Sequence, residues 1–113
     1  LMHAVLMALG RFLGLDGALT TSSASSPVTS ATRTVRGAGT LRFSSVLSDG
    51  GTPQYSHNGG AFASITEGMT LAVVSGDTLA VRATLITVGF TASFTLANNA
   101  SGVLIEGVTL TRT

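Results

Sequence analysis

The chain has 113 residues, a length that fits one small domain with an appended segment. Only 10% of the residues are charged, and six arginines against five acids leave a net charge of +1; ordinary soluble domains carry about 25% charged residues. The absence of cysteine excludes disulfides, zinc-thiolate sites and thiol nucleophiles. With a mean hydropathy of +0.50, this composition favours a surface covered by assembly partners. The alternative is a monomer coated with Ser and Thr hydroxyls.

Residues 1–16 are predicted to form an apolar anchoring helix. Its apolar side chains recur at the three- and four-residue spacing of one helix face, and Asp16-Gly17 is a stop signal. A helix of this length reaches about 22 Å, too short to cross a membrane comfortably, so no membrane span is expected. Docking onto another chain is favoured over packing on the chain's own sheet. The predicted interface side chains are Met2, Val5, Leu6, Leu9, Phe12 and Leu13.

Residues 17–36 are predicted to be an extended arm or linker. Ser, Thr and Ala dominate this tract, which has too few large apolar side chains to form a core alone. Arg33–Arg36, at its end, is expected to open the strand series. Arg33 and Arg36 are added to the predicted assembly interface, where they would pair with acidic groups of a neighbouring subunit.

Short strands separated by turn signals fill residues 37–113. Leu41–Leu47 changes its inward phase part-way, which predicts a β-bulge near Ser44-Ser45. Ser48–Gly51 predicts a turn. The tetrapeptide His57-Asn58-Gly59-Gly60 predicts a tight hairpin, because Asn-Gly readily adopts the positive φ angles that such turns require.

The later strands alternate clearly between two faces. Leu79, Val81, Ala83 and Leu85 share one face, and so do Phe90, Ala92, Phe94 and Leu96. About seven short antiparallel strands at this spacing predict an all-β sandwich, with a small barrel as the alternative. The large core side chains are expected to be Phe43, Phe62, Phe90 and Phe94.

Residues able to do chemistry are few and scattered. The two histidines are His3, in the apolar segment, and His57, in the hairpin turn. The carboxylates are Asp16, Asp49, Glu67, Asp77 and Glu106, each placed singly in a turn or near a strand end. Metal sites and nucleophilic triads need such groups to converge. No catalytic, cofactor-binding or metal-binding residue is therefore predicted, and the chain is not expected to be an enzyme.

The polar and aromatic side chains leave three kinds of binding to consider: calcium, nucleic acid and glycan. Asp49, Asp77 and the pair Asn98/Asn99 offer oxygens to Ca²⁺, but without calcium-loop spacing, so turn formation is favoured. The Arg33, Arg36 and Arg42 cluster is too small to predict a nucleic-acid partner. Tyr55 is the only Tyr or Trp available to stack on a sugar ring, which leaves glycan binding as an alternative.

The stretch from Pro53 to Thr113 resembles an immunoglobulin-like module of bacteriophage structural proteins and bacterial surface proteins. Four pieces carry the likeness in the same order: a Tyr/Ser-Asn-Gly-Gly hairpin at Tyr55–Gly60, a Gly-Asp-Thr entry into a strand at Gly76–Thr84, a Thr-rich strand at Thr91–Leu96 and a closing strand at Val108–Thr113.

The resemblance implies a non-enzymatic virion component, such as a tail, head-decoration or fibre-attachment protein, and it carries over no catalytic residue. The expected location is the virion, and the expected partners are other copies of the chain and other virion proteins. The alternative is an adhesive, glycan-binding module on a phage fibre or on the bacterial cell surface.

Overall fold

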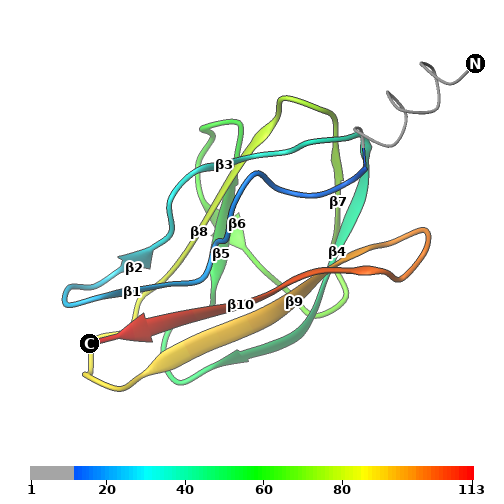
Figure 1. The fold of residues 1–113 in the computed structure, drawn as a ribbon. Coiled ribbons are helices and arrows are strands. Elements are labelled where there is room, and N and C mark those ends of the chain that lie inside the picture. The colour runs from blue at the N-terminus through cyan, green and yellow to red at the C-terminus, as the bar shows by residue number, and fades with distance from the viewer. Residues whose placement is uncertain (1–11) are drawn as a thin grey trace, which may run out of the picture.

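Two β-sheets pack face to face in the computed structural model of the chain, which describes residues 12–113 (Figure 1). The first sheet has the order β1 (Thr21–Ser23), β10 (Leu104–Arg112), β9 (Thr91–Asn98), β4 (Gly39–Ser48) and β7 (Thr70–Val73). The second has the order β2 (Val28–Thr29), β8 (Thr78–Ala83), β5 (Gln54–His57) and β6 (Ala63–Ser64), with β3 (Arg33–Thr34) also paired to β8.

Every strand pair is antiparallel except β1 with β10, which is parallel. No helix occurs within residues 12–113. The predicted all-β sandwich is therefore confirmed, with ten strands in place of about seven.

The core lies between the sheets and follows the predicted alternation. Leu79, Val81 and Ala83 are buried on one side, and Ala92, Phe94 and Leu96 are buried on the other. Phe43 of β4 is fully buried, and its ring centroid lies 5.7 Å from those of both Phe94 and Tyr55. Tilted aromatic pairs at this spacing add to the stability that their buried area provides.

Two of the four predicted core phenylalanines lie at its margin. Phe90 is only half-buried, although it packs against the core. Phe62 is half-buried outside the core cluster, with the guanidinium of Arg82 4.0 Å from its ring centroid. An arginine over an aromatic face is an attractive arrangement at a partly exposed site. The expectation that Phe62 fills the core was wrong, because β6 is an edge strand.

The predicted bulge in β4 is confirmed. The register of β4 against β9 shifts between Ser44 and Leu47, and Ser45 has a φ of 53°. The Glu67 carboxylate accepts hydrogen bonds from the amides of Ser45 and Val46, at 3.1 and 2.9 Å. A bulge removes ladder partners from the backbone, and this side chain replaces them.

The predicted hairpin turn between β5 and β6 is also confirmed. Asn58 and Gly59 have φ angles of 54° and 73°, and the Gly60 amide donates to the His57 carbonyl at 3.1 Å. Two consecutive positive φ angles are what this type of tight turn requires, and Asn-Gly adopts them at low cost.

Residues 12–16, the end of the predicted helix, are not helical. Leu15 forms an isolated antiparallel bridge with Val35, and Leu13 and Leu15 both pack against the core. The backbone is extended because it pairs with a neighbouring segment, and such tertiary pairing overrides a helical apolar pattern. Residues 1–11, the rest of that prediction, lie outside the described residues.

Residues 17–32 differ from the expected arm or linker, because they supply β1 and β2 to the chain's own sheets, whereas β3 at Arg33–Thr34 falls where the opening strand was predicted. Leu19, Val28 and Val35 are fully or almost fully buried in the core. Ser30 is also buried, and its hydroxyl accepts a hydrogen bond from the Val81 amide at 2.9 Å. A few well-placed apolar residues, with hydroxyls that bond to the backbone, are enough to attach this tract. The sandwich consequently begins before residue 37.

The burial of Phe43 predicts a large loss of stability on truncation. Phe43→Ala should lower the free energy of unfolding by about 3–5 kcal/mol, since it leaves a cavity at the centre of the core. Phe62→Ala is the matched control and should cost clearly less, because that ring is partly exposed. Urea denaturation followed by circular dichroism measures both values, and equal losses would contradict this assignment of the core.

Candidate functional site

The predicted assembly residues are distributed over three environments. Met2, Val5, Leu6 and Leu9 lie outside the described residues. Phe12 is exposed, and Leu13 is half-buried with its side chain against Gly39. Arg36 is exposed, whereas Arg33 is half-buried and donates through Nε to the Ala18 carbonyl at 2.7 Å. The assembly role of these residues stays a prediction.

Residues 14–16 are fixed to the segment that contains β3 by three hydrogen bonds. The Asp16 amide donates to the Thr34 carbonyl at 3.0 Å, and the Thr34 amide donates to Asp16 Oδ1 at 2.9 Å. The Arg36 amide donates to the Gly14 carbonyl at 2.8 Å. The chain therefore enters the described structure at Phe12 along a defined path.

A groove of about 700 Å³ lies beside this entry point. One wall is the entering segment, and the other is the β9–β10 connection with the start of β10; Figure 1 shows both at the same end of the sandwich. We call this surface the apolar end groove. It is lined by Phe12, Leu13, Gly14, Leu15, Asn98, Ser101, Val103, Leu104 and Ile105.

Large apolar side chains are unusually exposed along this groove. Phe12, Val103 and Leu104 have 69%, 63% and 62% of their surface accessible. Single exposed apolar residues are ordinary, but neighbouring ones form a patch that is typical of interaction sites. The apolar end groove is thus the strongest candidate for a binding surface among residues 12–113.

Sequence reasoning identified Phe12 and Leu13 but missed Val103 and Leu104. The run Val103-Leu104-Ile105 was not among the predicted interface residues. Consecutive residues of a strand point to opposite faces, so three large apolar residues in a row cannot all be buried by one core. That uninterrupted run was the available signal for an apolar surface on the outer face.

Glu106 connects the groove region to the N-terminal segment. Its carboxylate Oε2 accepts from the amides of Leu19 and Thr20, at 2.7 and 3.3 Å, next to a register irregularity between Leu104 and Glu106. Thr20 continues the attachment: its Oγ1 donates to the Gly107 carbonyl at 3.2 Å and accepts from the Thr109 amide at 3.1 Å.

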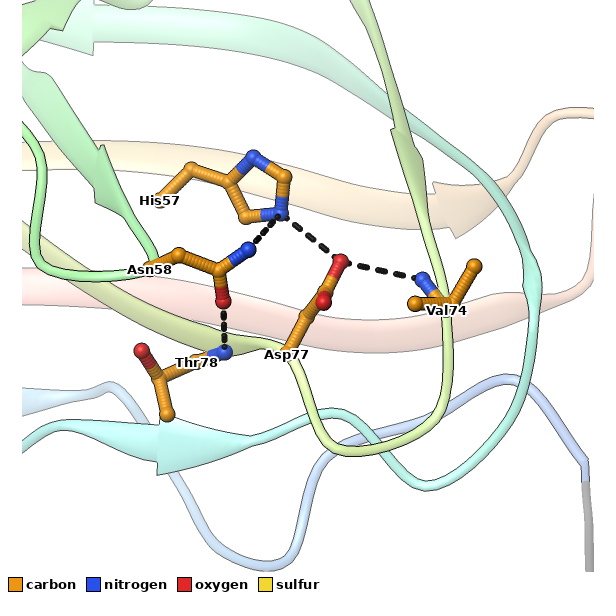
Figure 2. Close-up of polar contacts among 5 residues, drawn as sticks. All are labelled: His57, Asn58, Val74, Asp77 and Thr78. Carbon is orange, nitrogen blue, oxygen red and sulfur yellow. Dashed lines mark hydrogen bonds and ion pairs between the residues drawn. The ribbon is translucent and has the colours of Figure 1, made fainter.

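A second polar cluster joins His57 of the β5–β6 hairpin to Asp77 of the β7–β8 turn (Figure 2). Nε2 of His57 lies 2.9 Å from Asp77 Oδ2, with 26% and 15% of the two side chains exposed. The carboxylate also accepts from the Val74 amide at 3.0 Å, and Asn58 Oδ1 accepts from the Thr78 amide at 2.9 Å.

The donor and acceptor atoms of this cluster follow from the hydrogen-bonding groups of each side chain. An ionised carboxylate only accepts, so Nε2 of His57 carries the proton and donates to Asp77. Asn58 Nδ2 lies 3.3 Å from the same nitrogen, but an amide nitrogen only donates, so this contact is not a hydrogen bond when Nε2 carries the proton. The hydrogen bond from His57, followed by that from the Val74 amide, lowers the pKa of Asp77 below its ordinary value of 3.8.

All five carboxylates accept hydrogen bonds from backbone amides. Besides Glu67, Asp77 and Glu106, Asp16 accepts from the Thr34 amide and Asp49 accepts from the Thr91 amide. Asp77 and Asn98 bond to the backbone of their own turns, as predicted, since the Asn98 amide oxygen accepts from the Ala100 amide, whereas Asp49 bonds to a residue far along the chain. No group of three or more His, Cys, Asp or Glu residues that could hold a metal ion occurs within residues 12–113.

Tyr55, the proposed sugar-stacking residue, is half-buried. Its ring lies against Phe43 with an interplanar angle of 33°, and it packs on the core. This contact gives the Tyr55 ring a structural role in the sandwich.

Neither protein-family models nor curated proteins give a match to this chain. Within the described part of the chain, no helix has the length and apolar character needed to cross a membrane.

The lowered pKa of Asp77 predicts a specific loss of stability in acid. A carboxylate with a folded pKa below its unfolded value contributes stability above the unfolded value, and this contribution disappears as pH falls through the folded pKa. Asp77→Asn should therefore be less stable than the parent at pH 6, and the difference should shrink as the pH falls below about 4. Urea titrations from pH 6 to pH 2.5 measure it; a constant difference would contradict the assignment.

The two amide contacts of Glu106 predict that it stabilises the attachment of the N-terminal segment. Glu106→Ala should lower the free energy of unfolding by about 1–2 kcal/mol, because two amides lose a charged acceptor. Glu106→Gln retains an acceptor oxygen and should lose less. Hydrogen exchange at the Leu19 and Thr20 amides provides the local readout, and unchanged protection in the alanine variant would refute the role.

Proposed function

We propose that this protein is a non-enzymatic structural component of a bacteriophage virion, as a tail, head-decoration or fibre-attachment protein. Its sandwich would be an immunoglobulin-like module, and it would assemble with copies of itself and with other virion proteins through its N-terminal segment. The observation that carries the proposal is the apolar end groove, which lies where that segment joins the sandwich.

The fold supports the comparison with immunoglobulin-like modules. The four sequence pieces that resemble such modules fall on the β5–β6 hairpin, β8, β9 and β10, in two packed antiparallel layers. Fold alone does not establish function, so the proposal rests on the surface and not on the topology.

The charge distribution supports an assembly role as well. Only 10% of residues are charged, and every carboxylate accepts a hydrogen bond from the chain's own backbone. Such a surface offers few groups for long-range electrostatic recognition, and three of its exposed large apolar side chains, Phe12, Val103 and Leu104, line the apolar end groove. Burial of apolar area is the main favourable term in most protein association.

Residues 17–36 contribute strands to the chain's own sheets. We therefore assign the attachment to other copies to residues 1–11 and the adjoining groove. The glycan-binding alternative, on a phage fibre or the bacterial surface, gains no support from Tyr55, whose ring packs on the core.

The proposal is tested by comparing the full chain with a variant lacking residues 1–11, each tagged and expressed in cells that produce the particles. The full chain should sediment with gradient-purified particles, whereas the shortened variant should stay in the soluble fractions. Both should unfold at nearly the same temperature, because Leu13, Leu15 and Asp16 keep their contacts.

Two controls make the result interpretable. Circular dichroism must show the same β-sheet signal in both proteins, since loss of the fold would mean that residues 1–11 belong to the core. Recovery of the full chain only in the soluble fractions would overturn the virion role.

A further inference from the structure

A second recess of about 380 Å³ adjoins the apolar end groove, and the two share Leu15 and Ile105 as lining residues. The second recess lies between Gly17–Thr20 and the stretch of β10 at Ile105–Gly107. We refer to the two neighbouring recesses together as the depression beside the start of β10.

This depression follows a stretch of open sheet edge. β1 pairs with β10 only from Leu110 to Arg112. Before that point, residues 15–20 diverge from β10 and reach it through the side chains of Thr20 and Glu106. Within residues 12–113 no strand pairs with the outer edge of β10 before Leu110, but the Thr20 hydroxyl already bonds to the Gly107 carbonyl, so the open stretch is Leu104–Glu106. An unpaired edge beside apolar side chains is a template for another chain segment.

We infer that this depression is the receptor for residues 1–11 of a second copy of the chain. The inference rests on the proposed assembly function and specifies the surface on which it occurs. Eight of these eleven residues are Leu, Met, Ala or Val. Their apolar side chains match the exposed Phe12, Val103 and Leu104 in character. Their one arginine, Arg11, is opposite in sign to Glu106, the one ionisable residue in the depression.

The path of the chain favours a second copy over the same copy. Followed toward the N-terminus, residues 16 to 14 run beside Thr34 to Arg36 and lead out of the sandwich at Phe12. To fill its own groove, the chain would have to reverse at once beside Phe12, which is itself a wall residue. A reversal takes about four residues and would leave only about seven to occupy the depression.

Reciprocal exchange satisfies both copies. Each chain supplies one segment and one receptor, so two copies related by a two-fold axis fill both depressions and close the assembly. A dimer formed in this way would cover the largest group of exposed apolar side chains at this end of the sandwich.

The absence of cysteine allows a clean crosslinking test in the full chain. Copies carrying Leu6→Cys are mixed with copies carrying Leu104→Cys and oxidised, and mass spectrometry identifies the linked pair. A covalent heterodimer is expected. The control replaces Leu104→Cys by Ile86→Cys and should give no such product. Ile86 is 72% exposed and belongs to the β8–β9 loop. That loop lies near the C-terminus, at the opposite end of the sandwich (Figure 1).

One chain carrying both Leu6→Cys and Leu104→Cys distinguishes the occupants. Disulfide-linked dimers support exchange between copies. A monomer with an internal disulfide, with no product in the mixed-copy experiment, means that the chain fills its own groove and overturns the inference.

A charge in the receptor provides an independent measurement. Leu104→Glu should weaken self-association at least about tenfold in sedimentation equilibrium, since it places a carboxylate against apolar residues. Ile86→Glu adds the same charge to an apolar position that is also exposed, 72% against 62% for Leu104, and should leave association unchanged. Equal effects of the two variants would overturn the inference, because the loss would then reflect net charge.

These results separate the inference from the proposed function. If deletion of residues 1–11 abolishes particle association while Leu104→Glu dimerises like the parent chain, the assembly role stands and the receptor assignment fails. If the full chain also stays out of the particles, the proposed function fails with it.

Discussion

Residues 14–20 are bonded to both sheets of the sandwich, and this double attachment governs the rest of the structure. Gly14 and Asp16 pair with the segment around β3, whereas Leu19 and Thr20 are held by Glu106 on β10. The attachment places Leu19 in the core and joins the edges of the two layers. The recess between Gly17–Thr20 and Ile105–Gly107 lies beside the same attachment. Packing and candidate function thus depend on the same few hydrogen bonds.

Local signals in the sequence were enough to predict most of residues 37–113. Asn58-Gly59 predicted its turn, the phase change in β4 predicted its bulge, and alternation predicted the buried faces of β8 and β9. Residues 12–36 were harder, because their structure depends on partners far along the chain. Leu19 and Glu106, for example, are separated by 87 positions. A Ser/Thr-rich tract with three buried apolar residues has the same local appearance as a linker. The groove was only half predicted: Leu104 begins β10, Val103 directly precedes it, and within residues 12–113 no strand pairs with the outer edge of β10 at this point.

The ionised side chains explain why the polar clusters are structural. Each carboxylate lies where the regular backbone pairing is interrupted: at the bulge of β4, in turns, or where the N-terminal segment meets the sheets. Amides without a ladder partner at such places need acceptors, and an aspartate or glutamate supplies a strong one. Even His57 and Asp77, which form a close histidine–carboxylate pair, connect two neighbouring turns. The acids that stand singly in turns of the sequence therefore supply hydrogen-bond acceptors to backbone amides.

The small number of charged side chains affects the rate at which two copies associate. Proteins with complementary charged surfaces attract each other over about a Debye length, roughly 8 Å at physiological salt, and collide productively more often. A chain with only 10% charged residues and a net charge of +1 has little such guidance. Recognition would begin only at contact, when water leaves the apolar surface, so encounter rates should lie near the unsteered range of about 10⁵–10⁶ M⁻¹s⁻¹ and change little with ionic strength.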